Sequence, residues 1–265
     1  MTKDFGMLRF NDSGPVIRLE LDRPQALNAL NRELLSELQV ALERARSRSQ
    51  ARVLLICGAG RAFCSGADLA NSAVRAGEPG YDAGEVLERH YNPLILSLAS
   101  LPLPVVARVQ GAAAGAGAML ALAADFVVAA RSAYFMFAFV KAGLVPDAGA
   151  HWLLPRLVGR ARAVRMMMLA EKIPAEQAAE WGLLYEVVDD DALDGTVDGL
   201  CNRLIEGPTR AYGLIRRGLL EASTASFGAA LALERELQRE AGSTEDFAEG
   251  VSAFRRKRPP AFRGR

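Results

Sequence analysis

Residues 111–130 read GAAAGAGAMLALAADFVVAA, and this stretch separates a membrane protein from a globular one. Its length matches the ~20 apolar residues of a membrane-spanning helix. However, most of its residues are alanine or glycine, it contains Asp125, and no Trp or Tyr stands directly at either end. We therefore predict a tightly packed core helix followed by a buried strand, and not a membrane span.

Strand and helix patterns alternate on both sides of this stretch. Residues 16–21 alternate apolar and polar side chains, as a half-buried strand does, whereas residues 52–57 form a continuous apolar run typical of a strand buried on both faces. Residues 31–47 carry apolar side chains at helical spacing, and Asn31 is a suitable N-cap. Further strands are expected at 105–109, 126–129, 133–137 and 185–188 and further helices at 84–100, from about 148, and at 175–181. This alternation predicts an α/β fold.

The pattern becomes mostly helical after the last expected strand. Pro208 suits the start of one helix, and the sequence Ser243-Thr-Glu-Asp246 can cap a final one. We therefore divide the chain into a core of residues 1–195 and a C-terminal helical region of residues 196–265.

Composition excludes several classes of function. The 265 residues include 32 Lys or Arg and 31 Asp or Glu, so the net charge of +1 gives no field for nucleic acid or an anionic membrane. Cys57, Cys64 and Cys201 form no CxxC pair, which argues against a disulfide framework or a cysteine zinc site and favours a reducing cytoplasm. His90 and His151 stand in no metal-binding frame, so no metal is expected.

Two glycine-rich turns follow apolar runs, at residues 60–69 (GRAFCSGADL) and 111–117 (GAAAGAG). Small side chains let a ligand approach the backbone, and backbone N–H groups at a helix start can stabilise a developing negative oxygen. The same composition also allows helices and strands to pack closely, so the turns alone leave both interpretations open. Neither turn has the GxGxxG spacing of a dinucleotide site, and the chain has no GxSxG elbow or phosphate-binding P-loop.

Four motifs in order resemble those of the crotonase (enoyl-CoA hydratase/isomerase) superfamily over nearly the whole chain. They are RPQALNAL at 23–30, FCSGADL at 63–69, residues 111–125, and GLVPDAG at 143–149. The resemblance implies a ββα spiral core, a C-terminal helical region that forms a homotrimer or hexamer, and an acyl-CoA thioester substrate. It implies no cofactor, because coenzyme A is part of the substrate.

The resemblance also assigns roles to individual residues. It implies that the backbone N–H groups of Ala67 and Ala116 bind the thioester oxygen. Coenzyme A contacts are expected at Ala62, Cys64, Ala67, Asp68, Leu69, Phe254 and Lys257. The last two would approach the nucleotide end of coenzyme A, in the same chain or in a neighbouring subunit. The basic run at 255–258 could equally be a solvated tail.

The acid/base positions depart from the hydratases of the family. Their two glutamates fall on Met119 and Phe139 of this chain, which line the expected substrate pocket but cannot transfer a proton. Because adding water requires a carboxylate, ordinary hydration is not expected. Asp147 remains, at a position where some isomerases of the family carry their catalytic aspartate. From its position alone, Asp147 could instead be a helix N-cap, whereas apolar neighbours would raise its pKa and favour a role as base.

A narrower resemblance points to the ring-epoxide isomerase branch of the superfamily. It rests on HYNPL at 90–94, WLLPR at 152–156, EGVSAF at 249–254 and KRPPAF at 257–262. It implies conversion of ring-1,2-epoxyphenylacetyl-CoA to the oxepin form, a double-bond shift in enoyl-CoA esters, or both, within phenylacetate catabolism. The alternatives are an enoyl-CoA hydratase or dienoyl-CoA isomerase of fatty-acid oxidation and, in another class, a non-catalytic acyl-CoA-binding trimer.

Overall fold

The main sheet positions the rest of the molecule. The computed structural model describes residues 5–70 and 77–265 of the chain. The strands of this sheet are, in spatial order, β1 (Leu8–Asn11), β2 (Val16–Leu21), β3 (Val53–Gly58), β4 (Val105–Val109), β6 (Phe126–Ala130) and β9 (Glu186–Val188). Strands β1 and β2 form an antiparallel hairpin, and each later pair of neighbours is parallel. The α/β class predicted from the alternating patterns is therefore confirmed.

The burial of the strands follows their sequence patterns. Every residue of β3 is buried, as expected for a continuous apolar run covered on both faces. Strand β2 alternates between partly and fully buried side chains, and its bounds are those that the period of two predicts. The central strands β3 and β4 form the middle of the core.

A second, small sheet contains the glycine-rich stretch that opened the sequence analysis. Its strands are β5 (Ala112–Ala114), β7 (Tyr134–Met136) and β8 (Ile173–Pro174). Helix α4 (Ala116–Leu122) follows β5 at once, and all of its residues are buried. The prediction of a core helix followed by a buried strand is confirmed, and the short strand β5 is an addition to it. None of the helices in the described ranges is long and apolar enough to cross a membrane.

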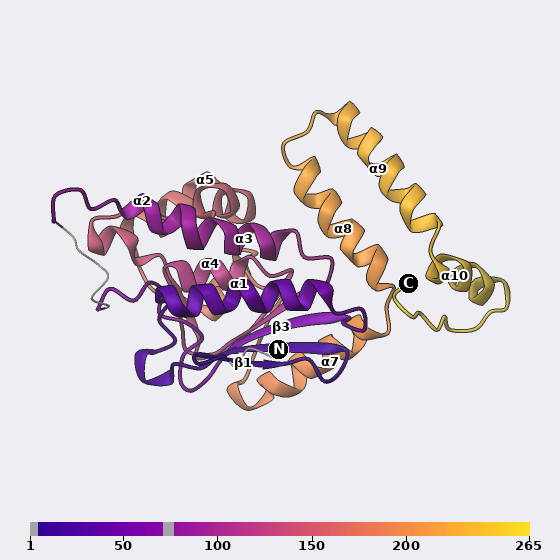
Figure 1. The fold of residues 1–265 in the computed structure, drawn as a ribbon, viewed down its shortest axis with the longest axis horizontal. Helices are drawn as coiled ribbons and strands as arrows, with labels where there is room; N and C mark the ends of the chain where they lie inside the picture. The colour runs from indigo at the N-terminus through magenta and orange to yellow at the C-terminus, as the bar shows by residue number, and fades with distance from the viewer. Residues whose placement is uncertain (1–4, 71–76) are drawn as a thin grey trace.

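Helices cover the sheet on both sides (Figure 1). The elements of the body are η1 (Pro24–Ala26), α1 (Arg32–Ser47), α2 (Ala83–Val86), η2 (Leu87–Tyr91), α3 (Asn92–Ala99), η3 (Ala138–Ala142), α5 (Ala150–Leu169), α6 (Ala175–Glu180), η4 (Asp190–Ala192) and α7 (Leu193–Ile205). Helix α1 begins as predicted, because the Asn31 side chain accepts a hydrogen bond of 2.9 Å from the Leu34 N–H. The expected helix at 84–100 is a helical path of three segments, since η2 is a π-helical turn between α2 and α3.

Three C-terminal helices form an arm that projects from the body in Figure 1. They are α8 (Thr209–Ala222), α9 (Phe227–Gly242) and α10 (Glu245–Arg255). Both predicted helix starts are present: Pro208 directly precedes α8, and the Thr244 side chain accepts a hydrogen bond from the Phe247 N–H at the start of α10. Helix α7 packs against β3, β4 and β6 of the main sheet, so the region from 196 onward includes one helix of the body. The domain boundary at 195 stays a prediction.

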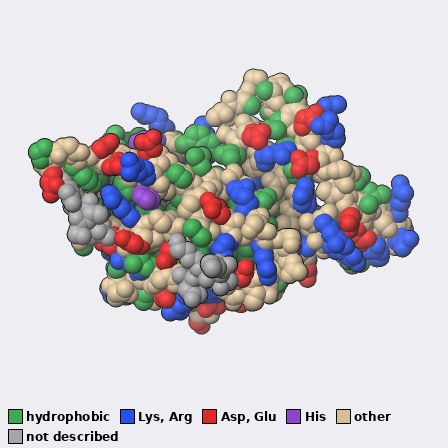
Figure 2. All heavy atoms as spheres, in the orientation of Figure 1, with side chains coloured by type: hydrophobic (Ala, Val, Ile, Leu, Met, Phe, Trp, Pro, Cys, Tyr) green, Lys and Arg blue, Asp and Glu red, His purple; other side chains and the backbone are tan. Residues whose placement is uncertain are grey.

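A mostly buried ion pair joins the arm to the body. The Arg216 side chain of α8 is 8% exposed, and its Nε lies 2.8 Å from a carboxylate oxygen of Asp125. Its other nitrogens donate to the backbone carbonyls of Leu98 and Leu101. On the surface, basic and acidic side chains are interspersed over the face in Figure 2, in keeping with the balanced composition.

Candidate active site

The first glycine-rich turn runs beside strand β5. Cys64 donates from its N–H to the carbonyl of Ala112 at 3.0 Å, and its own carbonyl accepts from Ala114 at 2.9 Å. This pairing is parallel, with Cys64 opposite Ala113. Beyond this pairing the two turns stay close: a Cβ on Gly66 would lie 3.5 Å from the Cα of Gly115, and Ala67 and Ala116 are the residues that directly follow these two glycines. The structure thus brings the two predicted oxyanion-binding residues together.

The geometry around Ala67 leaves its N–H unused. Leu30 donates to the Gly66 carbonyl at 2.8 Å and accepts from the Asp68 N–H at 3.0 Å. These bonds use the backbone groups on either side of Ala67, so the N–H of Ala67 itself points away from Leu30. Its carbonyl accepts from Leu69 at 3.0 Å, whereas no described residue accepts from its N–H. A ligand oxygen could take that place.

The second turn ends at the first N–H of α4, for which no acceptor is found among residues 5–70 and 77–265. Gly115 adopts φ +50 and ψ −129, a conformation that residues with a side chain rarely reach. Ala116 follows as the first residue of α4, where the N–H has no partner within the helix. The first turn also requires a glycine where it faces the second turn, because a Cβ on Gly66, at φ +98, would lie 2.8 Å from the Ala114 carbonyl oxygen. The two turns therefore approach each other backbone to backbone.

Asp147 lies in the loop between η3 and α5. Its Oδ1 is buried and has no hydrogen-bond partner among the described residues. Burial raises the pKa of its carboxyl from 3.8 to about 6, because a desolvated carboxylate is disfavoured. Asp147 is not the N-cap of α5, since Gly149 holds that position at φ 84, so the interpretation as a cap is wrong. Ala148 between them also adopts the left-handed region at φ +50, and backbone strain of this kind is typical of functional loops.

Tyr91 is a neighbour of this site that the sequence reasoning missed. It ends the π-helical turn η2, and its residue surface is 5% exposed. Burial raises the pKa of its hydroxyl well above the ordinary value, and the charges of Asp147, Cys64 and Asp68 raise it further. Tyr91 therefore lies close to both Asp147 and the first turn. Its motif, HYNPL at 90–94, was noted in the sequence, but a single π turn leaves no pattern from which the exposure of one ring can be read.

The two positions where family hydratases have glutamates are apolar and close to the second turn. Met119 is fully buried in α4, and its N–H donates to the Gly115 carbonyl at 3.2 Å. Phe139 is partly buried in η3, and its ring atom Cζ lies 3.9 Å from the place where a Cβ of Gly115 would stand. Apolar groups near the turn lower the local dielectric and strengthen any hydrogen bond to a ligand oxygen there.

The other residues expected to contact coenzyme A in the first turn differ in accessibility. Ala62 and Cys64 are buried, and the Cys64 thiol donates to the Asn28 carbonyl at 3.1 Å, so any contact would use their backbone. Asp68 forms an ion pair with Arg23 at 2.9 Å. Leu69 is 57% exposed and offers its side chain directly.

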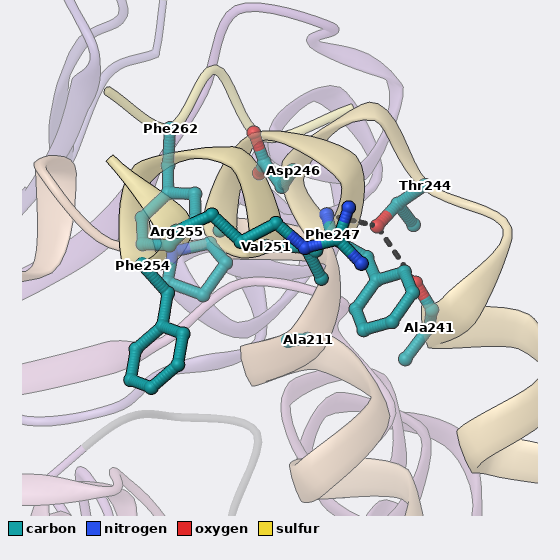
Figure 3. A pocket seen from close by; sticks show the side chains of 11 residues that line it. Ala211, Ala241, Thr244, Asp246, Phe247, Val251, Phe254, Arg255 and Phe262 are labelled. Carbon is teal, nitrogen blue, oxygen red and sulfur yellow. Dashed lines mark hydrogen bonds between the residues drawn. The ribbon is translucent and has the colours of Figure 1, made fainter. Parts of the chain in front are cut away.

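The structure does not bring Phe254 and Lys257 to the two turns within one chain. Phe254 is on α10, which lies at the far end of the molecule from α2 in Figure 1, and Lys257 follows α10 at φ +50. Phe254 as a whole residue is 86% exposed, at the rim of an apolar cavity of about 460 Å³ (Figure 3). The cavity is also lined by Phe247 and Phe262. The contact of these two residues with coenzyme A, in the same chain or in a neighbouring subunit, stays a prediction.

Comparisons with known proteins agree on one family. Residues 11–265 match the family described as Enoyl-CoA hydratase/isomerase. The chain is 48% identical to the 1,2-epoxyphenylacetyl-CoA isomerase of Escherichia coli K12, over 94% of this chain and 95% of that protein. It is 47% identical to a probable enoyl-CoA hydratase of Rhodobacter capsulatus, over 97% and 98% of the two chains. The crystal structure of an enoyl-CoA hydratase from Polaromonas sp. JS666 superposes with a TM-score of 0.88 at 33% identity, covering 97% of this chain and 100% of that one.

Proposed function

The chain belongs to the enoyl-CoA hydratase/isomerase (crotonase) family, and from this premise we propose that it isomerises coenzyme A thioesters with Asp147 as its single base. Membership makes it an enzyme of this family, and an acyl-CoA thioester fits as its substrate. The observation that carries the choice of isomerisation is the buried, unpaired Oδ1 of Asp147.

The N–H groups of Ala67 and Ala116 supply the electrostatic part of the mechanism. Both donate to the thioester oxygen, and their bonds strengthen as negative charge develops there. Asp147 removes a proton from the carbon next to the carbonyl, and the electron pair of that C–H bond moves into an enolate. With a pKa of about 6, the Asp147 carboxylate is mostly ionised at pH 7 and still basic enough to accept the proton.

The same carboxyl completes the reaction by returning a proton, either the one it removed or one that has exchanged with solvent. For a 3-enoyl ester, protonation two carbons further along the chain moves the double bond, and the product has the composition of the substrate. Met119 and Phe139 favour this outcome, because neither side chain can hold and deprotonate a water molecule.

A ring epoxide of phenylacetyl-CoA is the substrate that we favour. In that ester, cleavage of the C–C bond shared by the epoxide and the six-membered ring gives a seven-membered ether. Asp147 takes the proton from the carbon next to the thioester and returns it to a ring carbon, while the electron pair of the broken C–H bond forms a double bond between that side-chain carbon and the ring. No atom is gained or lost. The E. coli relative is named for this reaction, which supports the choice.

Hydration of enoyl-CoA is the second candidate. The R. capsulatus relative, at nearly the same identity, is named as a probable hydratase. A hydratase built on this chain would have to position its water with Asp147 alone.

We also propose that the chain assembles as a homotrimer or hexamer, as its family resemblance implies. The arm carries large apolar side chains that are at least half exposed in the single chain, among them Ile215, Leu219, Phe227 and Leu231. Light scattering on the purified protein tests this, and a monomer would contradict it.

Mass spectrometry of coenzyme A esters in heavy water tests the activity. The wild-type protein and Asp147→Asn are each incubated with a 2-enoyl-CoA and a 3-enoyl-CoA. We expect a double-bond shift with deuterium incorporated and no water added, and loss of this shift in the variant. A product heavier by one water would return the protein to the hydratases. An absence of turnover for these esters and for the ring epoxide would favour a non-catalytic binder.

A further inference from the structure

The motif RPQALNAL at 23–30 is not used by the chemistry described above, yet it contacts the first turn at several points. Arg23 reaches the turn directly: its Nη2 lies 2.9 Å from Oδ2 of Asp68, and these side chains are only 14% and 13% exposed. Its Nη1 donates to the Ala29 carbonyl. One guanidinium group thus joins residue 68, next to the donor Ala67, to the segment that ends at Leu30.

Backbone bonds join the same two segments beside this ion pair. Leu30 bonds to Gly66 and Asp68, on either side of Ala67. The ion pair and the backbone bridge together fix the peptide that carries the Ala67 N–H. A shift of even about 0.5 Å in a preorganised donor is enough to weaken its action on a transition state.

Asn28 holds the other end of the motif in place. It is fully buried at φ +56, and its Nδ2 donates to the carbonyls of Ala59, Ala62 and Phe63 at 2.9–3.1 Å. Its Oδ1 accepts from the Arg23 N–H at 2.9 Å. The backbone of Arg23 is therefore fixed, through Asn28, to the loop that leads into the first turn.

Charge gives Arg23 a second effect. Asp68 follows Ala67 directly, so an unneutralised carboxylate there would oppose the negative oxygen that the Ala67 N–H is to stabilise. Within the described residues, no cation other than Arg23 lies within ion-pair distance of Asp68. A mostly buried ion pair adds little net stability, because desolvation offsets the attraction, so stability alone does not account for this pair.

We propose that Arg23 is a positioning residue for the reaction: its ion pair with Asp68 orients the Ala67 N–H and cancels the charge beside the oxyanion site. This inference rests on the proposed function for the identity of that donor. Removing the cation should weaken transition-state stabilisation more than substrate binding. Losing a whole oxyanion donor costs ~10²–10³ in rate, so a misplaced donor should cost about 10- to 100-fold in kcat.

The test compares Arg23→Met with a matched control, Arg216→Met. Both substitutions remove the cation of a mostly buried ion pair, but Arg216 lies at the joint between arm and body. Two readouts are taken on the folded protein: kcat and KM for the ester that the enzyme turns over, and the infrared carbonyl stretch of a bound 2-enoyl-CoA. The carbonyl stretch reports polarisation by the two N–H donors without requiring turnover.

For Arg23→Met we expect kcat to fall about 10- to 100-fold, KM to change less than about threefold, and the bound carbonyl stretch to move toward that of the free ester. Arg216→Met should keep both readouts at the wild-type values, and Arg23→Lys should recover part of the loss because it retains the charge. If Arg23→Met does not fold, Arg23→Lys and Asp68→Asn provide the same readouts with a smaller perturbation.

Wild-type kcat and carbonyl stretch in the Arg23 variants would overturn the inference, as would equal losses in Arg23→Met and Arg216→Met. A wild-type protein that shifts the carbonyl stretch but turns over no ester would overturn the proposed function alone, and the Arg23 dependence of that shift would still support the inference. A wild-type protein that does not shift the carbonyl stretch would overturn both.

Discussion

Replacing Asp147 by asparagine should stabilise the protein while it removes the activity. Folding raises the pKa of this carboxyl from 3.8 to about 6, so the folded chain binds the proton more tightly than the unfolded chain. Ionisation of Asp147 therefore destabilises the fold. The full free-energy cost applies above the folded pKa of about 6, and no cost applies below the unfolded pKa of 3.8. At ~1.36 kcal/mol for each pH unit between the two pKa values, the cost at pH 7 is at most about 3 kcal/mol, and less where water reaches the carboxylate.

Asparagine has a similar shape and no charge, so the variant should gain about 1–3 kcal/mol in free energy of unfolding near pH 7. The gain should shrink as the pH falls from about 6 to about 4, because the wild-type carboxyl becomes protonated in that window. The isomerase rate should fall about 10²- to 10⁴-fold, the usual contribution of a general base.

Urea unfolding curves of both proteins, at about pH 7.5 and about pH 4.5, measure the stability difference and its pH dependence. Asp191→Asn, at an exposed aspartate of η4, is the matched control and should change neither stability nor rate appreciably. The reasoning would be refuted if Asp147→Asn were less stable than the wild type near neutral pH, or if its gain were the same at both pH values.

Three further predictions concern the base, the turns and the arm. The kcat/KM of the wild type should fall about tenfold for each pH unit below about 6, as Asp147 takes up its proton, and a flat profile down to pH 5 would exclude it as the base. Gly117→Ala should lower the free energy of unfolding by about 1–3 kcal/mol, because the new Cβ would lie 2.6 Å from the Cys64 carbonyl oxygen. Calorimetry measures the loss of stability, and an unchanged Tm would contradict this prediction. Phe254→Ala should raise KM for coenzyme A esters but not for pantetheine esters, which lack the nucleotide, and equal effects on both would disprove the predicted contact.

Much of the fold could be read from local patterns. Four features match the expectation closely: strand β2, helix α1 with its Asn31 cap, strand β4 and the cap of α10 at Thr244. Each of them depends on residues that are near one another in the sequence. Strand β5 was not predicted. Three alanines carry no β preference, and Ala112–Ala114 becomes a strand only through pairing with β7 and with Cys64.

The sequence proposes residues for the candidate site but not their geometry. Motif resemblance singled out Asp147. Only the structure shows that Gly149, and not Asp147, is the N-cap of α5, and that Oδ1 of Asp147 has no hydrogen-bond partner among the described residues. The position of Tyr91 beside the site depends on a π turn, and the ion pair of Arg23 depends on a contact 45 residues away along the chain. Contacts of such long range are set by tertiary packing, which a local pattern does not encode.

Transfer of a deuterium label within one substrate molecule tests the single-base isomerase most directly. A 3-enoyl-CoA deuterated at the carbon next to the thioester is converted in ordinary water, and the product is examined at early times by NMR. We predict that part of the product carries deuterium two carbons further along the chain, because the Asp147 carboxyl that removes the label also returns it. A product that never carries the label at that carbon, or that has gained a water molecule, would contradict the account.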